Sequence, residues 1–243
     1  MKCTDKQIDI SANCCIIIPA WQEEDNIFSV CKSVRDMGFN VVVINDASTD
    51  ETATRAMAAG ATVIHHPYNM GYASALQTGY NFALDKGYTT IVQMDGDGQH
   101  DPADIPKLFA KLQEDGADIV VGSRFLGVGD YHMPMMRRWG QYFFRFLTRL
   151  LCGRDFSDPT SGYQALSRAA LLLYTSDWFA DEYPDADMLI LASKQGLRIS
   201  EVGVSMRADT TGKSMHSGFW HPLWYILRVT LGCFIAMQRR SKT

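Results

Sequence analysis

Through the first half of this 243-residue chain, short runs rich in β-branched residues alternate with segments of helical periodicity. The five runs with the length and composition of strands are CCIIIP (14–19), NVVVIN (40–45), ATVIHH (61–66), TTIVQMD (89–95) and ADIVVG (117–122). Helical periodicity occupies residues 23–37, 50–59, 71–85 and 103–114. The alternation predicts an α/β domain whose mostly parallel central sheet is covered by helices on both faces.

Charge is distributed unevenly over the chain. The formal net charge of −4 argues against a nucleic-acid partner, because phosphate contacts need a dominant basic face. Residues 131–154 nevertheless contain five arginines and no acid, and the segment from Thr210 onward contains five lysines or arginines and no acid. We predict that these two segments face anions.

Cysteine usage and hydropathy indicate the cellular setting. The six cysteines form no CxxC pair, so we expect neither a zinc site nor a disulfide framework, and we infer a reducing, cytoplasmic location. The N-terminal segment MKCTDKQIDIS lacks the apolar core of an export signal. The longest apolar segment, residues 223–237, contains Arg228 and is too short to span a bilayer unaided.

Polar residues follow four of the predicted strands, at 19–23, 45–48, 95–97 and 122–124. In parallel α/β sheets, ligands bind outside the carboxyl ends of the strands. Asp46, at the end of a buried strand, is a suitable hydrogen-bond acceptor for the edge of a nucleobase. Helix capping explains the nearby Ser48 and Asp50, but it does not explain Asp46.

The segment MDGDGQHDP (94–102) places acidic residues on a glycine-rich turn after the fourth strand. A calcium loop starting at Asp95 is excluded, because its fifth, sixth and twelfth positions hold Gln99, His100 and Pro106. Two interpretations remain, a solvated turn or a site for Mg²⁺ or Mn²⁺. In the second, Asp97 binds the metal directly or together with Asp95 through water. Asp101 is predicted to cap the helix that begins at Pro102.

Six segments in order resemble the motifs of the family 2 glycosyltransferases. IPAWQEE (18–24) is similar to their opening IPAxNEE, VVINDASTDET (42–52) to VVDDGSTDxT, and MDGDGQHDP to their DxD element. GSR (122–124), DPTSGYQALSR (158–168) and RADTTGKSMH (207–216) follow in the order of the dolichyl- and polyprenyl-phosphate sugar transferases of that family, including the mannosyltransferases. The resemblance covers about residues 14–216 and implies a GT-A type nucleotide-sugar-binding fold.

The resemblance also implies roles for individual residues. Those implied to bind the nucleotide are Pro19, Trp21, Glu23 and Asp46, with Asp46 pairing with the base. Those implied to hold the nucleotide sugar and the metal are Asp95, Gly96, Asp97 and, as a further metal neighbour, Gln99. Those implied to contact phosphates are Arg124, Arg207 and Lys213. Arg138 matches the arginine that meets the lipid phosphate in the dolichyl-phosphate mannosyltransferases.

The chain departs from the family pattern at several positions. The residues that replace the usual ones are Trp21, Gln22, Asn45, Ala73 and Gln164. The first four leave the base and the sugar unspecified, and Gln164 removes a positive charge. None of them alters the predicted fold.

Two further helices are predicted near the two basic segments. In a helix over 135–151, Arg138, Arg145 and Arg149 share one stripe, and an apolar arc lies opposite, formed by Met135, Trp139, Phe143, Phe146, Leu147 and Leu150. A second helix begins at HPLWY (221–225) and is apolar almost all round. We therefore divide the chain into a catalytic domain, 1–218, and an interfacial or dimerisation helix, 219–243. The open alternatives are peripheral membrane contact, docking on an integral membrane partner, and homodimerisation.

The resulting hypothesis is a metal-dependent, inverting glycosyltransferase that charges a polyprenyl phosphate at the cytoplasmic membrane face. The residues assigned to catalysis are Asp97, Arg124, Arg138 and Asp187. A sugar hydroxyl acceptor is the alternative and would need a carboxylate base, for which Asp185 and Asp187 are candidates unless they only cap a helix. A nucleotidyltransferase or a non-catalytic nucleotide-sugar-binding adaptor is the alternative from another class.

Overall fold

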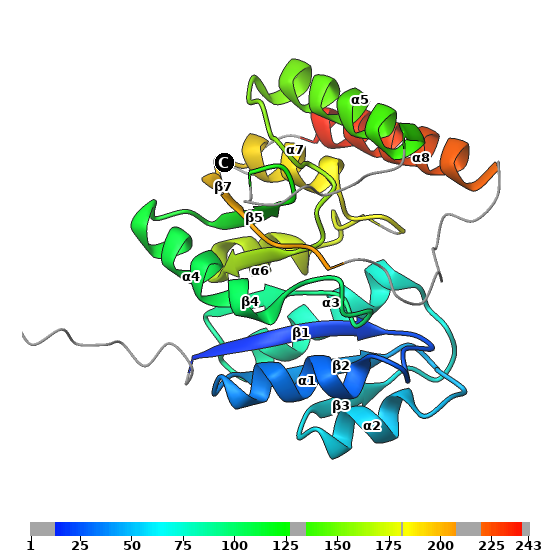
Figure 1. The fold of residues 1–243 in the computed structure, drawn as a ribbon. Helices are drawn as coiled ribbons and strands as arrows, with labels where there is room; N and C mark the ends of the chain where they lie inside the picture. The colour runs from blue at the N-terminus through cyan, green and yellow to red at the C-terminus, as the bar shows by residue number, and fades with distance from the viewer. Residues whose placement is uncertain (1–12, 127–134, 181, 208–219, 240–243) are drawn as a thin grey trace, which may run out of the picture.

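The computed structural model describes residues 13–126, 135–180, 182–207 and 220–239 (Figure 1). Its strands are β1 (Cys14–Ala20), β2 (Asn40–Asn45), β3 (Thr62–His65), β4 (Thr90–Gln93), β5 (Ile119–Ser123), β6 (Gln164–Ser167) and β7 (Ile199–Gly203). Its helices are α1 (Ile27–Asp36), α2 (Thr52–Ala58), α3 (Tyr72–Asp85), α4 (Ile105–Glu114), α5 (Met135–Cys152), α6 (Arg168–Tyr174), α7 (Ala186–Lys194) and α8 (Trp220–Gln238). A short 3-10 turn, η1 (Pro102–Asp104), precedes α4.

The described strands form one sheet in the order β3-β2-β1-β4-β6-β5-β7. Four neighbouring pairs are parallel, namely β1 with β2, β1 with β4, β2 with β3, and β5 with β7. β6 runs antiparallel to both β4 and β5. The predicted mostly parallel sheet is therefore confirmed, and the carboxyl ends of β1, β2, β4 and β5 share one edge.

Alternating residues of β1 show how the sheet separates two cores. Ile16 and Ile18 belong to the core under α1 and α4, whereas Cys15 and Ile17 belong to the core under α3, α6 and α7. Helices therefore cover both faces, as predicted (Figure 1). α3 approaches β1 closely, because a Cβ at Gly79 would lie 2.4 Å from Cγ2 of Ile17.

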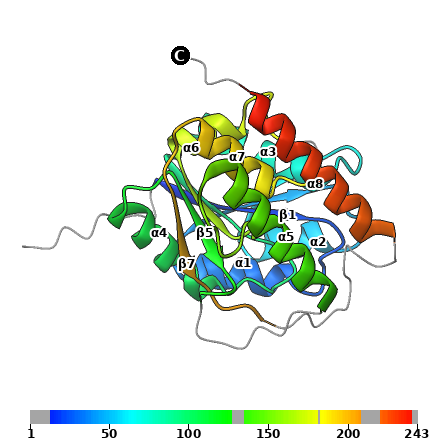
Figure 2. The same ribbon diagram turned by 90° about the horizontal axis from the view of Figure 1, so that it is seen from above.

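At the end of the molecule farthest from β3, α7 packs against both α5 and α8 (Figures 1 and 2). An ordinary surface helix would bury the apolar arc predicted for α5. The structure instead buries Phe144 and Thr148, and of the members of that arc whose side chains it describes only Leu147 is buried. The large apolar side chains that are exposed on α5 are Trp139, Tyr142, Phe143, Phe146 and Leu150.

In the predicted basic stripe of α5, Arg138 and Arg149 are exposed, and Arg145 pairs with Asp155 at 3.1 Å. On α8, Val229, Cys233 and Ala236 are buried, while the exposed apolar side chains are Trp224, Leu227, Leu231, Phe234 and Ile235. Within the described ranges, no helix has the combined length and hydropathy needed to cross a membrane. The two helices thus present apolar faces at one end of the fold.

Candidate functional site

The loops that follow β1 and β2 are joined by hydrogen bonds at the predicted ligand edge. The backbone N–H of Gln22 donates to Oγ of Ser48 at 3.0 Å, and its side-chain Nε2 donates to Oγ1 of Thr49 at 2.8 Å. The N–H of Glu23 donates to Oγ1 of Thr52 at 2.8 Å. The IPAWQEE and NDASTDET motifs therefore form one connected surface.

Two residues of these loops adopt left-handed backbone conformations, Gln22 with φ 59° and Ala47 with φ 57°. Each costs about 1–2 kcal/mol for a residue with a side chain. Backbone strain of this kind is concentrated at ligand-binding sites. Beside Gln22, the Trp21 side chain is 55% exposed and presents an open aromatic face at this edge.

Asp46 is buried and accepts hydrogen bonds through both carboxylate oxygens. Oδ1 accepts from Nδ1 of His66 at 2.7 Å and from the N–H of Met70 at 2.7 Å, and Oδ2 accepts from the N–H of Gly71 at 2.8 Å. The carboxylate therefore fixes the turn that precedes α3. Pairing of Asp46 with a base stays a prediction, and a base would have to share these oxygens with the protein's own donors.

Asp95 lies at the centre of a hydrogen-bonded cluster after β4. Its Oδ1 accepts from the hydroxyl of Tyr72 at 3.0 Å, and its N–H donates to Nδ1 of His100 at 3.0 Å. Burial lowers the pKa of His100 to about 4, so the imidazole is neutral near pH 7 and carries its proton on Nε2. The Nε2 of His100 lies 3.8 Å from Oδ2 of Asp95.

Burial raises the pKa of Asp95, and burial together with the charge of Asp95 raises the pKa of Asp97. Within the described residues, no cluster of three or more His, Cys, Asp or Glu side chains is arranged to hold a metal ion. The pair nevertheless fits a magnesium or manganese ion, because such ions take few protein carboxylates and complete their shell with water and substrate phosphates. A cation here would favour the ionised carboxylates that burial disfavours.

Gln99 holds the Asp97 side of the turn. Its N–H and Nε2 donate to the two carboxylate oxygens of Asp97 at 2.9 and 2.5 Å, and its carbonyl accepts from the N–H of Arg207 at 2.8 Å. The guanidinium of Arg207 donates to Asp101 at 3.0 Å. Asp101 also accepts from the N–H of Ala103, so its predicted capping of the turn begun by Pro102 is confirmed.

Arg124 follows β5 and is held by Asp158 of the DPTSGYQALSR segment. Its Nε donates to Oδ2 of Asp158 at 2.7 Å and its guanidinium Nη2 to Oδ1 at 2.6 Å. The same Nη2 donates to Oγ1 of Thr160 at 3.0 Å. The Asp158 side chain is completely buried, so this bidentate pair fixes the guanidinium firmly. Contact of Arg124 with a phosphate stays a prediction.

Asp185 and Asp187 have different positions at the start of α7. The Asp187 carboxylate accepts from the N–H groups of Asp185 and Met188 at 3.1 and 2.9 Å, and a Cβ at Gly232 of α8 would lie 2.7 Å from its Oδ2. Asp185 instead lies where the charges of Arg124 and Asp95 influence its pKa. The structure therefore brings Asp185, rather than the assigned Asp187, toward the strand-end cluster.

The remaining predicted residues have separate positions. Pro19 is buried in β1, Glu23 is half-buried, and Gly96 lies beneath the end of β1, where a Cβ would be 3.5 Å from the carbonyl of Pro19. Arg138 is exposed on α5. Lys213 lies outside the described residues. Sequence reasoning missed Tyr72 and His100 as partners of Asp95, although His100 stands inside the quoted DGDGQHDP segment.

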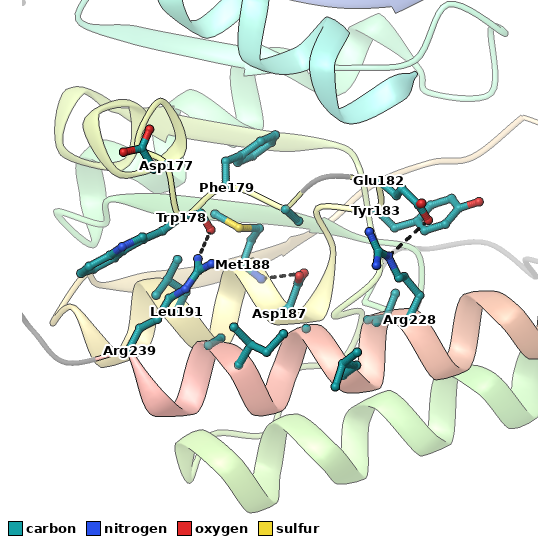
Figure 3. Close-up of a pocket in the computed structure, with 16 residues that line it drawn as sticks. Asp177, Trp178, Phe179, Glu182, Tyr183, Asp187, Met188, Leu191, Arg228 and Arg239 are labelled. Carbon is teal, nitrogen blue, oxygen red and sulfur yellow. Dashed lines mark hydrogen bonds and ion pairs between the residues drawn. The ribbon is translucent and has the colours of Figure 1, made fainter. Parts of the chain in front are cut away.

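A separate cavity of about 260 Å³ lies between α7, α8 and residues 177–180 and 182–183 (Figure 3). Apolar side chains line it together with Asp187. At its rim, Arg228 pairs with Glu182 at 3.4 Å, and Arg239 donates to the carbonyl of Trp178. Asp187 thus faces this helical cavity.

The fold and this strand-end site define a GT-A type glycosyltransferase. The sequence profile described as glycosyl transferase family 2 matches residues 15–173, and the chain belongs to that family. It is 30% identical to the UDP-N-acetylglucosamine--dolichyl-phosphate N-acetylglucosaminyltransferase of Methanococcus voltae over 209 residues, covering 78% of this chain and 83% of that protein. It is 29% identical to the undecaprenyl-phosphate mannosyltransferase of Micrococcus luteus over 212 residues, covering 83% and 86%.

The fold also matches a solved glycosyltransferase structure. Glucosyl-3-phosphoglycerate synthase from Mycobacterium tuberculosis, in complex with uridine diphosphate, superposes with a TM-score of 0.72 at 21% identity. The superposition covers 96% of this chain and 84% of that one. The predicted family, fold class and glycosyltransferase activity are therefore confirmed, and the nucleotidyltransferase alternative is excluded.

Proposed function

We propose that this glycosyltransferase moves a sugar from a nucleoside diphosphate sugar to a polyprenyl phosphate at the cytoplasmic face of the membrane. The observation that carries the proposal is the pair of carboxylates, Asp95 and Asp97, with raised pKa values at the strand ends. The two carboxylates lie at the carboxyl ends of the parallel strands, where nucleotides bind in α/β folds of this kind. The acceptors of the two relatives, a dolichyl phosphate and an undecaprenyl phosphate, support a polyprenyl phosphate as the acceptor here.

In this proposal, different residues contact the nucleoside and the diphosphate of the donor. The loops that carry Trp21 and Asp46 receive the nucleoside, and Arg124, held by Asp158, donates to phosphate oxygens. A magnesium or manganese ion held by Asp95, Asp97 and Gln99 would neutralise charge that develops on the departing diphosphate. Tyr72 orients Asp95 through its hydroxyl.

On the acceptor side, an ionised phosphate attacks without a general base, and in-line attack inverts the anomeric centre. Arg138, exposed on α5, would hold that phosphate. Asp185 would accept hydrogen bonds from hydroxyls of the transferred sugar. Catalysis by Asp187 is not part of this proposal, because its carboxylate is directed toward Gly232 of α8.

The exposed apolar faces of α5 and α8 support a peripheral membrane location. They lie at the same end of the fold, and each contains tryptophan with leucine or phenylalanine at the surface. Amphipathic helices of this kind lie in the interfacial region of a bilayer. In this proposal α8, Trp220–Gln238, serves as an interfacial element of the catalytic domain; a homodimer contact and an integral membrane partner are the alternatives.

A specific observation favours one second candidate, a glycosyltransferase with a sugar hydroxyl acceptor. Burial raises the pKa of Asp185 to about 6, which suits a general base near neutral pH. In that case Asp185 would remove the proton of the attacking hydroxyl.

The deciding experiment offers radiolabelled UDP-N-acetylglucosamine, UDP-glucose or GDP-mannose with Mn²⁺ to two acceptors. Undecaprenyl phosphate in detergent is the first acceptor, and a lipid-linked N-acetylglucosamine is the second. We expect an acid-labile lipid phosphate sugar from the first acceptor and loss of transfer in EDTA. Transfer to the second acceptor alone would establish the hydroxyl candidate instead, and full activity in EDTA would contradict metal dependence.

A further inference from the structure

The side chain of Asp185, the residue that precedes α7, does not cap that helix. Asp185 occupies the N-cap position, yet its side chain makes no capping hydrogen bond. Asp187 accepts instead from the N–H groups of Asp185 and Met188 at 3.1 and 2.9 Å. An aspartate at an N-cap ordinarily satisfies the first helical N–H groups itself. Because Asp187 accepts these N–H groups, the Asp185 carboxylate is available to a different partner.

That partner comes from α8, forty residues farther along the chain. The hydroxyl of Tyr225 donates to Oδ2 of Asp185 at 2.5 Å. The Tyr225 ring is held between two other aromatic rings, with its centroid 5.1 Å from that of Tyr183 and 5.7 Å from that of Phe144 on α5. Both pairs are edge-to-face, which is a favoured aromatic geometry. The position of the hydroxyl is therefore fixed by packing.

α8 itself is anchored directly on α7. Val229, Cys233 and Ala236 are buried in the core beneath it. Gly232 faces Asp187 so closely that a Cβ there would lie 2.7 Å from the carboxylate. The helix that exposes Phe234 outward therefore places Tyr225 inward with little freedom to shift.

We propose that Tyr225 is a positioning residue that orients Asp185 toward the transferred sugar, so that the C-terminal helix completes the active site. The proposal rests on the proposed function, in which Asp185 contacts sugar hydroxyls. The charged groups that act on Asp185 are Arg124, Asp95, Asp158 and, through the shared turn, Asp187. A carboxylate with these neighbours needs a fixed donor to hold one rotamer.

The test compares Tyr225→Phe with Tyr183→Phe. The first variant keeps the ring between its aromatic neighbours and removes only the hydroxyl. The second removes a neighbouring hydroxyl and keeps the ring against Tyr225. We expect Tyr225→Phe to lower kcat about tenfold while the donor KM changes less than about twofold, and Tyr183→Phe to stay near wild type. Equal kcat values in the two variants would overturn the proposal.

A second measurement does not depend on transfer. The carboxyl ¹³C signal of Asp185, assigned with Asp185→Asn, is followed over pH in protein labelled at aspartate. The hydrogen bond from Tyr225 lowers the pKa of Asp185, so its loss in Tyr225→Phe should move the midpoint upward from about 6. An unchanged titration would overturn the positioning role. If the wild type transfers no sugar to either acceptor, the proposed function fails, while this titration still decides the contact.

Discussion

The strand-end region, formed by the loops after β1, β2, β4 and β5, differs from the helical end, formed by α5, α7 and α8, in how its side chains are held. At the strand ends, polar side chains are held by the protein itself, as when Asp158 fixes Arg124 and backbone N–H groups fix Asp46. At the helical end, apolar side chains such as Trp139 of α5, 73% exposed, have no cover from the described fold. A rigid polar edge suits a small charged donor, whereas an uncovered apolar face suits a lipid surface.

Asp97→Asn should have the largest effect, because it removes one charge from the proposed cation site while preserving shape. We expect transfer to fall about 10³-fold. The melting temperature should be equal to or above that of wild type, since burial disfavours the charge that is removed. Transfer kinetics and calorimetry measure the two quantities. Wild-type turnover in the variant would place the metal, and the donor function of this edge, elsewhere.

Arg138→Ala tests whether the helical end recognises the acceptor phosphate. Loss of a charged hydrogen-bond donor should raise the KM for undecaprenyl phosphate about 10- to 100-fold and leave the donor KM within about twofold. Arg149→Ala is the matched control, because Arg149 is also exposed on α5. Equal losses for donor and acceptor would remove the assigned role of Arg138. Equal losses in both variants would indicate a general effect of basic charge.

Phe234→Glu tests whether the apolar face meets a membrane. The residue is exposed on α8, and replacing an apolar contact by a charge should weaken sedimentation with anionic vesicles about tenfold. Leu172→Glu is the control, since Leu172 is 55% exposed on α6. If both variants sediment like wild type and the oligomeric state of Phe234→Glu changes instead, the face is a dimer contact.

The difference between the two regions also explains what the sequence could predict. β1 to β5 and the polar strand ends follow from local periodicity, whereas β6 and β7 were not predicted. Asp101 with Pro102 is a local capping signal. β6 was missed because its four residues, QALS, stand in a polar segment and gain their strand conformation by pairing with β4 and β5. The contact of Tyr225 with Asp185 joins residues forty positions apart, so no local sequence pattern predicts it. The outward direction of the α5 arc likewise depends on how α7 packs.

Asp187→Asn should have the smallest effect, on stability and not on transfer. Burial and the charge of Asp185 raise the pKa of Asp187 to about 7, so between about pH 4 and pH 7 the folded state binds a proton that the unfolded state releases. The wild type therefore loses stability as pH rises through this window, whereas Asn keeps the hydrogen bonds from Asp185 and Met188 without titrating. The melting temperature of the variant should exceed wild type by about 2–6 °C at pH 8 and by little at pH 4.

Asp177→Asn is the control for this last comparison, because Asp177 is an exposed carboxylate lining the same cavity. Its melting temperature should follow wild type at every pH. Calorimetry between about pH 4 and pH 8, combined with transfer assays, distinguishes a structural role of Asp187 from a catalytic one. A large loss of transfer in Asp187→Asn, with no pH-dependent gain in melting temperature, would return the catalytic assignment from Asp185 to Asp187. The helical cavity would then belong to the active site as well.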